Sequence, residues 1–335
     1  MTETVSWRRT LPGAVAGLAL LALAFGLSLT LGARAVAWSD MLAVLQGPPE
    51  TLAEAAGAAR LPRSLLAMLA GAALGLAGAA MQGVTRNPLA DPGLLGTNAG
   101  AALAVVIAMA TVGIGSAALS VWVAVLGAGL ASAGVYAIAN LGRGGASPLK
   151  LALAGAALTA AMSSSTTAIL LPRGDIGGLA QSWMIGGVGG ARLETILPVL
   201  PFLGAGALAV LGAARKLNLL AMGEDMARGL GERVGLARAL AAGGAVLLAG
   251  AVTALCGPIG FVGLIVPHGC RVVLGGDYRR ILPASALGGA VLLLLADVAG
   301  RLIATPGEVD AGIITALIGG PVFIWIVRHG KAVAV

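Results

Sequence analysis

Charged residues are scarce in this chain. Only 35 of its 335 residues carry a charge, 21 as Lys or Arg and 14 as Asp or Glu, whereas 58% are apolar. About 25% of the residues of a soluble domain are charged, against 10% here. So few charges could not cover the surface of a water-soluble fold. The composition therefore excludes a soluble enzyme, a nucleic-acid-binding protein and a disordered chain, and it indicates an all-α polytopic membrane protein.

Cysteine and histidine are also rare, with two of each. Cys256 and Cys270 lie in apolar sequence, and together with His268 they lack both a paired spacing and a fourth metal ligand. We therefore interpret the cysteines as small core residues and expect no metal site. His268 has no acidic residue nearby in the sequence, so an intramembrane enzyme would lack a nucleophile–base pair.

The sequence lacks a phosphate-binding loop. Its single Gly-Lys pair, Gly330-Lys331, is not followed by Ser or Thr. We therefore expect that the chain is not an enzyme and binds no cofactor of its own. If ATP drives its function, the ATP and its magnesium ion belong to a separate ATPase.

Long uncharged stretches fill most of the chain, and a membrane span needs about 20 mostly apolar residues. The uncharged runs are 10–33, 64–85, 92–142, 151–172, 195–214, 239–270, 281–296 and 311–327. The 92–142 run predicts two spans with a turn near residues 113–116. The 239–270 run is either one long helix or two spans broken at Cys256-Gly257-Pro258.

The first run has two interpretations. Arg8 and Arg9 precede it, and Ala35-Val-Ala37 has the small-residue pattern of a signal-peptide cleavage site. However, the run covers 24 uncharged residues, and the apolar region of a signal peptide has about 7–15. We interpret it as the first membrane span.

The positive residues favour ten spans over nine. Ten spans with a cytoplasmic N-terminus place 15 Lys and Arg residues inside and six outside, at positions 34, 60, 63, 173, 192 and 301. Nine spans give 11 and 10, so the positive-inside rule favours ten spans with both termini in the cytoplasm. Ten spans also allow an inverted repeat of five plus five, which a faint likeness between 71–79 and 244–251 supports weakly.

The loop 215–238 is the most polar part of the chain, with eight charges in 24 residues. Within it Met222, Met226 and Leu230 follow one another at four-residue intervals, which predicts one or two short amphipathic helices outside the bilayer. One interpretation is a solvated loop that folds back on the protein. The other is a docking surface for a soluble partner.

Three arginines lie near the ends of predicted spans. Arg60 and Arg63 flank Pro62 near the start of the second span, where Pro suits the first turn of a helix, and Arg301 can pair with Asp297 one turn earlier. These arginines either anchor the helices at the membrane interface or form a cationic rim for an acidic partner.

The segment 87–93 contains two prolines and an acid, which predicts a structured loop or re-entrant turn.

Several motifs together resemble one family. They are Arg60-Leu-Pro-Arg63, the Gly-Ala-rich segment from Gly71 to Gln82, Arg86-Asn-Pro-Leu-Ala-Asp-Pro-Gly-Leu-Leu-Gly96, Gly257-Pro-Ile-Gly-Phe-Val-Gly-Leu-Ile-Val-Pro-His268 and Leu295-Ala-Asp297. In this order they resemble the FecCD-type permease subunits of ATP-binding-cassette (ABC) importers, which are type II importers for iron-siderophores, haem and vitamin B12. The resemblance runs from about residue 10 to residue 330.

The resemblance implies a ten-helix permease that works as a dimer with two cytoplasmic ATPase subunits and an extracytoplasmic binding protein. It implies that Arg60, Arg63 and Arg301 receive glutamates of the binding protein. It also implies that the loop between spans six and seven forms coupling helices in the ATPase cleft. The matching residues of that loop are Gly223, Glu224, Met226, Ala227, Leu230 and Gly231.

The resemblance also suggests a translocation pathway at the dimer interface. Its candidate lining residues are Gln82, Asn98, Ser163, Ser164 and Thr167. The alternative for the hydroxyl groups is that they bond to carbonyls of their own helix. The segments 96–100 and 306–309 resemble ferric-siderophore members more than haem or vitamin B12 members. The sequence at Gly269-Cys270 and at Asp310-Ala311 departs from the usual pattern of the family.

We therefore expect residues 1–335 to form a single transmembrane permease domain in the cytoplasmic (inner) membrane, moving a ferric-siderophore by alternating access. Haem or vitamin B12 import by the same family is the alternative. An ion-coupled secondary transporter is a more distant one, because it needs intramembrane titratable groups and only Asp297 approximately qualifies.

Overall fold

The computed structural model describes residues 7–113, 117–141 and 148–329, and every regular element within these ranges is a helix. The elements are α1 (Trp7–Thr30), α2 (Trp38–Gln46), α3 (Leu52–Thr85), η1 (Pro92–Leu95), α4 (Thr97–Thr111), α5 (Ala117–Asn140), α6 (Pro148–Leu170), α7 (Gly174–Ile185), α8 (Leu193–Ile196), η2 (Leu197–Val199), α9 (Leu200–Gly212), α10 (Ala214–Ala221), α11 (Glu224–Gly229), α12 (Val234–Cys256), α13 (Val262–Leu274), α14 (Tyr278–Ile303) and α15 (Ala311–His329).

The protein is a multi-pass membrane protein. In the described part of the chain, seven helical segments are long and apolar enough to cross a membrane, and three shorter apolar helices accompany them. The short ones are Thr97–Thr111, Val262–Leu274 and Ala311–Ile326. The first uncharged run forms α1, one continuous helix, which confirms that it is long enough for a span.

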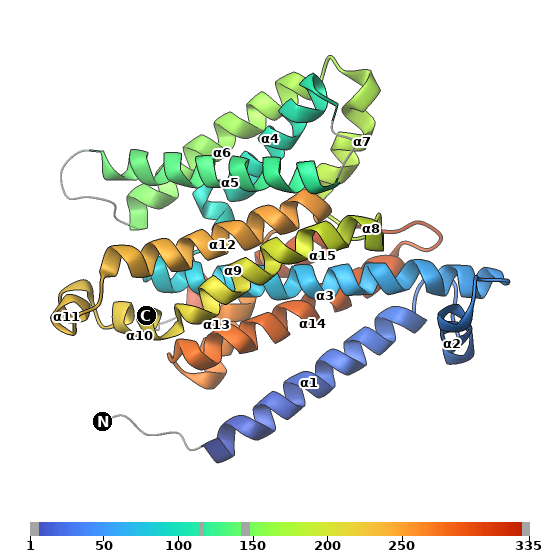
Figure 1. Ribbon diagram of the computed structural model, residues 1–335, viewed down its shortest axis with the longest axis horizontal. Helices are drawn as coiled ribbons and strands as arrows, with labels where there is room; N and C mark the ends of the chain where they lie inside the picture. Colours follow the sequence, from blue (N-terminus) through green and yellow to red (C-terminus); the bar gives the residue numbers. More distant parts are fainter. Residues whose placement is uncertain (1–6, 114–116, 142–147, 330–335) are drawn as a thin grey trace.

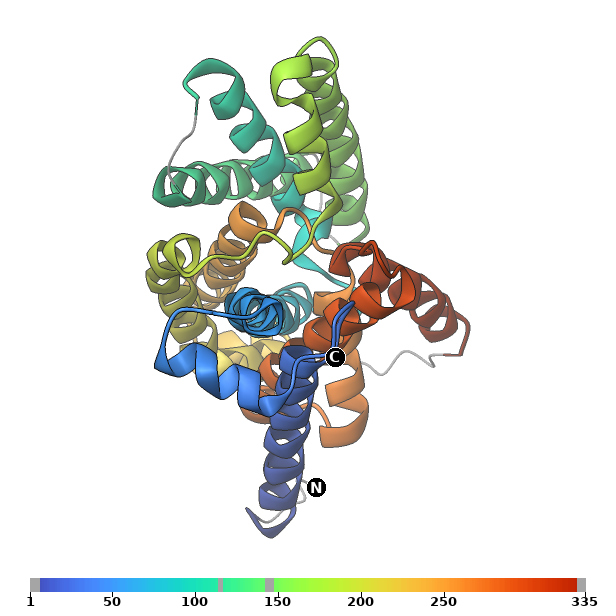
Figure 2. The same ribbon diagram turned by 90° about the vertical axis from the view of Figure 1, so that its right-hand side faces the viewer.

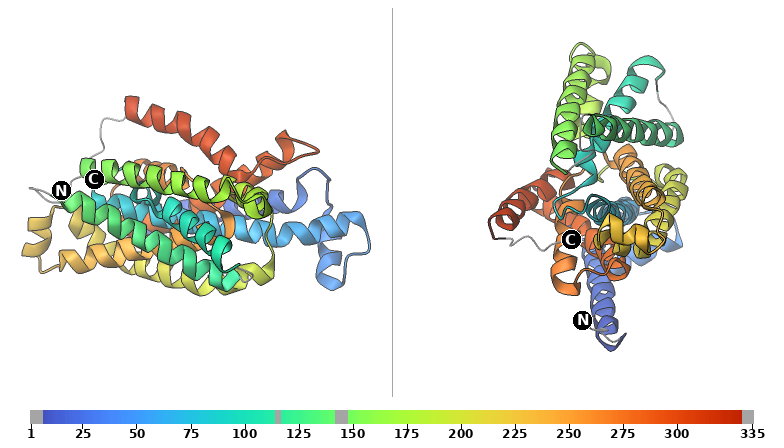
Figure 3. Two further views of the ribbon diagram at one scale, coloured as in Figure 1. Left: turned by 90° about the horizontal axis from the view of Figure 1, so that it is seen from above. Right: turned by 90° about the vertical axis from the view of Figure 1, so that its left-hand side faces the viewer.

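Helix α3 is the centre of the bundle, seen nearly end-on and surrounded by other helices in Figure 2. In the most apolar stretch of α3, 78% of the residues are buried, whereas in the most apolar stretch of α1 only 17% are buried. Helices α4 to α7 form a group on one side, where α4 and α5 pack on α12, whereas α1 lies along the opposite side (Figure 1). Helix α15 runs along an edge of the bundle in both views of Figure 3.

Glycines allow the central helices to touch through their backbones. A Cβ atom on Gly71 would collide with the carbonyl of Gly289, and one on Gly75 would collide with the carbonyl of Ser285, so α3 and α14 pack without side chains between them. A Cβ on Gly78 would likewise collide with the backbone of Gly263 in α13. This close packing is what the small-residue pattern of α3 predicts.

The 239–270 run is broken, so it does not form one long helix. Helix α12 ends at Cys256 and α13 begins at Val262. Between them Gly257 has a φ of +68°, and Phe261 also has a φ of +68°, which is unusual for a bulky residue. The Phe261 ring lies against Gly319 of α15, where there is no Cβ to obstruct it. The break therefore depends on contacts from another helix.

The 92–142 run contains two helices, as predicted, because α4 ends at Thr111 and α5 begins at Ala117. The turn predicted at 113–116 falls mainly on residues 114–116, outside the described residues. Cys256 is buried and Cys270 is half-buried, and both are free thiols. Among the described residues no group of three His, Cys, Asp or Glu side chains could hold a metal ion.

The start of the second span was predicted wrongly. Helix α3 begins at Leu52, so Pro62 lies inside the helix and not in its first turn. The helix starts early because Thr51 and Glu54 form a capping box: the Thr51 hydroxyl accepts from the Glu54 amide at 3.2 Å, and a Glu54 carboxylate oxygen accepts from the Thr51 amide at 3.3 Å. Helices α2 and α7 were not predicted either.

The contact of α3 with α13 yields a stability prediction. Gly78→Ala places a methyl group against the backbone of Gly263, so the helices must separate, and overpacking of this kind costs about 1–3 kcal/mol. We expect a clearly lower thermal unfolding temperature in detergent, measured by circular dichroism.

Gly243→Ala in α12 is the matched control. Its new methyl group meets nothing within 4 Å, so helix propensity predicts unchanged or slightly raised stability, by at most about 1 kcal/mol. Equal effects of the two substitutions would contradict the role given to Gly78.

Candidate functional site

One cluster of charged side chains joins the ends of α3 and α14. The Arg63 guanidinium contacts Asp297 through its Nε (2.9 Å to Oδ1) and one Nη (2.8 Å to Oδ1), and its other Nη lies 2.5 Å from Glu308. Arg301 also reaches Asp297, at 3.1 Å to Oδ2. The predicted Asp297–Arg301 pair is thus confirmed, and the carboxylate is shared with Arg63. Asp297 is fully buried between two cations.

Two arginines, Arg301 of this cluster and Arg60 one turn before Arg63, bind the end of α1. The Arg301 Nη atoms donate to the carbonyl of Ser28 at 3.0 Å, and one donates to that of Leu31 at 2.8 Å. Arg60 donates to the carbonyls of Leu29 at 3.1 Å and Thr30 at 2.8 Å, and also to that of Arg34. The last carbonyls of a helix have no partner within the helix and carry its negative dipole end. Arg60 and Arg301 therefore cap α1.

The structure brings the three predicted docking residues together, but it leaves them unequally accessible. Arg60 and Arg301 are buried, whereas Arg63 has 12% of its side chain exposed and Glu308 has 44% exposed. Sequence reasoning missed Glu308 and the carbonyls of α1. The presence of Asp297 in the sequence could have pointed to this cluster, because a carboxylate in an apolar helix requires cationic partners.

The polar loop 215–238 forms two short helices, α10 and α11, at one end of the bundle beyond α9 and α12 (Figure 1). Met222, Met226 and Leu230 are each more than half exposed. Only Met226 lies within a helix, α11, whereas Met222 follows the end of α10 and Leu230 follows the end of α11. Ala227, in contrast, is fully buried beneath this stripe. Met222, Met226 and Leu230 therefore form an exposed apolar stripe in the polar loop, beyond the ends of the long apolar helices.

Ion pairs and glycines hold α10 and α11 in place. Glu224 pairs with Arg228 at 3.1 Å and also with Arg238 of α12, which fixes the start of α11. Gly223 and Gly231, on either side of α11, have φ values of +107° and +81°. Side-chain-bearing residues rarely adopt such values. The turns around α11 therefore require glycine at both positions.

The five predicted pathway residues lie in three different places. Gln82 is fully buried and donates to the carbonyl of Leu264 at 3.2 Å, while its Oε1 has no hydrogen-bond partner among the described residues. Asn98 is half-buried, with its amide 3.5 Å from the carbonyl of Ile259. Ser163, Ser164 and Thr167 are exposed on α6.

Some of the Ser and Thr hydroxyl groups of α6 bond to carbonyls of their own helix, which was the alternative to a role in the pathway. Thr167 donates to the carbonyl of Ser163 at 3.0 Å, and Thr166 and Ser165 also bond to carbonyls one turn back in α6. No such bond is found for the hydroxyl groups of Ser163 and Ser164 in the described part of the chain. The exposed polar face of α6 is therefore partly satisfied by its own helix.

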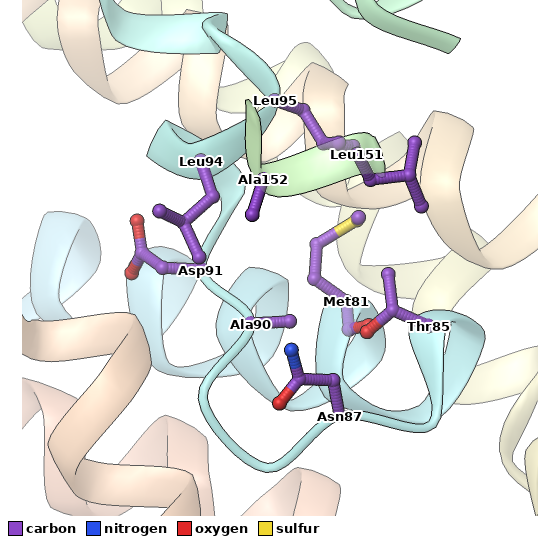
Figure 4. Close-up of a pocket in the computed structure, with 9 residues that line it drawn as sticks. All are labelled: Met81, Thr85, Asn87, Ala90, Asp91, Leu94, Leu95, Leu151 and Ala152. Atoms are coloured by element: carbon purple, nitrogen blue, oxygen red, sulfur yellow. The ribbon is translucent and has the colours of Figure 1, made fainter. Parts of the chain in front are cut away.

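The segment 87–93 is a structured loop, as predicted. The Asp91 carboxylate accepts from the amide of Gly93 at 2.8 Å and caps η1, and Asn87 accepts from the amide of Leu89 at 3.0 Å. With the end of α3 and the start of α6, this loop encloses a cavity of about 20 Å³ (Figure 4). Such a volume holds about one water molecule. The cavity therefore does not accommodate a bulky ligand.

Comparison with known proteins agrees with this architecture. The FecCD transport family matches residues 20–329. The chain is 47% identical to the probable siderophore transport system permease protein YfiZ of Bacillus subtilis (strain 168), over 81% of each chain. It is 43% identical to the ferric enterobactin transport system permease protein FepD of Escherichia coli (strain K12), over 93% of each chain.

A solved structure extends the comparison to three dimensions. It is described as an inward-facing conformation of a metal-chelate type ABC transporter. The match has a TM-score of 0.80 and 28% sequence identity, and it covers 97% of this chain and 100% of the other. Because the family match covers most of the chain and the fold agrees throughout, this chain belongs to the FecCD transport family.

Proposed function

We propose that this chain is the transmembrane permease subunit of an ATP-driven ABC importer. The observation that carries the proposal is the exposed stripe of Met222, Met226 and Leu230, on α11 and directly beside it, beyond the spans. Exposed apolar side chains in a charged loop fit a protein partner better than water. Membership of the FecCD transport family supports an ATPase as that partner.

The proposed topology has ten spans with both termini in the cytoplasm. Seven long apolar segments and three shorter apolar helices support this topology, in which each of them is one crossing. Helices α4 and α13 are short because the breaks before them, at 87–96 and 257–261, extend into the bundle, where Asn98 reaches the carbonyl of Ile259. Residues 1–335 then form one permease domain, with 215–238 as its coupling loop.

Helix packing supports an inverted repeat of five plus five spans. Helix α3, as the second span, packs on α14 and α13, which are the ninth and eighth spans. Helix α12, as the seventh span, packs on α5 and α4, which are the fourth and third. In a five-plus-five repeat, spans two, three and four correspond to spans seven, eight and nine. The contacts of α3 and the contacts of α12 are then equivalent to each other.

The two ends of the bundle have different proposed partners. At the α10–α11 end, Gly223, Glu224, Met226, Ala227, Leu230 and Gly231 form the coupling surface for the ATPase, which binds ATP and its magnesium ion. At the opposite end, Arg60, Arg63 and Arg301 are the proposed docking residues for an extracytoplasmic binding protein, with Arg63 at the surface and Arg60 and Arg301 buried behind it. Arg63 is the arginine of the cluster that is partly exposed, so its positive charge suits a glutamate of a partner.

The proposed substrate is a ferric-siderophore, with haem or vitamin B12 as the alternative. The names of both relatives, a siderophore permease and a ferric enterobactin permease, support it. The ligand would pass by alternating access between two permease copies, identical or paralogous, in the cytoplasmic (inner) membrane. Gln82, Asn98, Ser163, Ser164 and Thr167 remain the proposed pathway residues, and the exposed ones lie on α6.

An ion-coupled secondary transporter is a weaker proposal. Such a protein needs a titratable group that is free to exchange protons or ions within the membrane. Asp297 is instead bound by Arg63 and Arg301 and is fully buried. Its charge is therefore committed to holding helices together.

Transport in reconstituted vesicles tests the function. With the cognate ATPase and binding protein present, we expect ferric-siderophore uptake that requires ATP hydrolysis. Met226→Asp places a charge in the apolar stripe, and losing an interface anchor of this kind costs about 2 kcal/mol or more. We therefore expect uptake at least about tenfold lower, with the ATPase activity of the complex no longer matched to transport.

Met226→Leu is the control, because it keeps the stripe apolar at similar volume, and it should transport like wild type. Uptake driven by a proton gradient without the ATPase would overturn the proposed function. Normal uptake by Met226→Asp would overturn only the coupling role of the stripe. Uptake of haem or vitamin B12 in place of the ferric-siderophore would change the substrate alone.

The docking surface yields a second prediction. Glu308 is the more exposed partner of Arg63 and occupies one of its Nη atoms, so it competes with any glutamate that a binding protein offers. Glu308→Gln should strengthen docking about two- to fivefold at low salt, as expected for one partly exposed ion pair. Affinity is measured by biolayer interferometry with the complex in nanodiscs.

The control is Glu50→Gln, which removes a carboxylate at the same end, in the segment before α3, without touching Arg63. It should leave docking within twofold of wild type. Weaker docking of Glu308→Gln would contradict the competition and would indicate that Glu308 itself holds the partner.

A further inference from the structure

An open pocket lies at the end of the bundle that carries α10, at the start of the loop 215–238, and none of the proposed coupling residues lines it. Its volume is about 380 Å³. It is lined by the end of α9, the start of α10 and the first turns of α14, through Leu211, Gly212, Ala214, Arg215, Tyr278, Arg279, Leu282 and Pro283. Here the chain changes from an apolar helix to the charged loop, so the pocket lies where a bilayer meets water.

Two arginines form the polar rim of this pocket. Arg215 and Arg279 are both exposed, and no carboxylate within the described residues forms an ion pair with either side chain. The nearest acid along the chain is Asp277, whose carboxylate accepts from the Asn218 amide at 2.6 Å and from the backbone amide of Arg279 at 3.0 Å. Asp277 also interacts electrostatically with Arg279 but forms no ion pair with it, so both guanidinium groups keep their hydrogen-bonding capacity for an anion.

A third cation lies behind the floor. The pocket floor consists of Tyr278 and Leu282, which are buried. The Tyr278 hydroxyl accepts a hydrogen bond from Arg271 Nη2 at 3.2 Å. The Arg271 side chain is only 4% exposed, and its Nη1 has no hydrogen-bond partner among the described residues. A buried cation without a carboxylate raises the positive potential of the pocket beyond what the rim supplies.

An apolar track leads from the pocket along α9. Leu211 lines the pocket, and Leu208, one turn earlier on the same face, is among the most exposed leucines of the described chain. A free phosphate ion would use only the arginines. A molecule with a phosphate group and hydrocarbon chains would use both the arginines and these leucines.

We propose that this pocket binds the headgroup phosphate of an anionic phospholipid, held by Arg215 and Arg279, with its acyl chains along Leu211 and Leu208. Basic pockets between helix ends at the cytoplasmic surface are suited to such headgroups. The site goes beyond the proposed transport function, because it requires only that this end of the bundle lies at a bilayer surface. It ties the first helix of the coupling loop to the lipid.

Native mass spectrometry of the full chain in detergent, titrated with phosphatidylglycerol or phosphatidylcholine, tests the proposal. Wild type should bind phosphatidylglycerol about tenfold or more tightly than phosphatidylcholine, since each arginine near the surface contributes to anionic-lipid binding. Arg215→Gln with Arg279→Gln should remove this preference. Gly212→Leu should also weaken binding, because it fills the pocket without changing its charge, and a Cβ at Gly212 meets nothing within 4 Å.

The charge-matched control is Arg192→Gln with Arg233→Gln, which removes two exposed arginines outside the pocket. It should keep the preference for phosphatidylglycerol. Equal loss in the control would overturn the proposal in favour of general surface charge. Competition by inorganic phosphate as strong as that by the lipid would overturn the lipid assignment, and unchanged binding in both pocket variants would overturn the site itself.

Discussion

Backbone contact between α3 and two later helices is the constraint on which the rest of the structure depends. Gly71, Gly75 and Gly78 allow α3 to touch α14 and α13 without intervening side chains. In a bilayer, helices gain little by hiding apolar surface from lipid, so close packing and polar contacts must supply the association. With α3 and α14 fixed in register, Arg63 meets Asp297 at one end, and Gly83 meets Tyr278 near the other.

That register explains how buried charges are tolerated. Asp297 and Arg301 are almost fully removed from solvent, which is costly unless every charge has partners. Asp297 has two arginines, and Arg301 has the carbonyls that end α1. The same contacts secure α1, which is otherwise little buried. The charged cluster therefore fastens a peripheral helix to the core and keeps Arg63 and Glu308 at the surface.

Much of the fold followed from the distribution of charge along the sequence. Uncharged runs located the apolar helices, the Cys256-Gly257-Pro258 segment located a real break, and the spacing of Met222 and Met226 located an exposed stripe. The start of α3 was missed because Glu54, Arg60 and Arg63 interrupt the uncharged stretch from which the span was located, although the Thr51–Glu54 capping box is a local signal for the true start. The capping of α1 by Arg60 and Arg301 was missed because backbone carbonyls leave no trace in a sequence.

The proposed function requires that the α10–α11 end meets the ATPase. The most direct measurement is site-specific photo-cross-linking in membranes, after replacing Cys256 and Cys270 with alanine. A benzophenone probe on Met226→Cys, in the exposed stripe, should form an adduct with the ATPase subunit. The same probe on Leu45→Cys, exposed on α2 at the opposite end, should form none. An ATPase adduct from position 45, or none from position 226, would contradict the account.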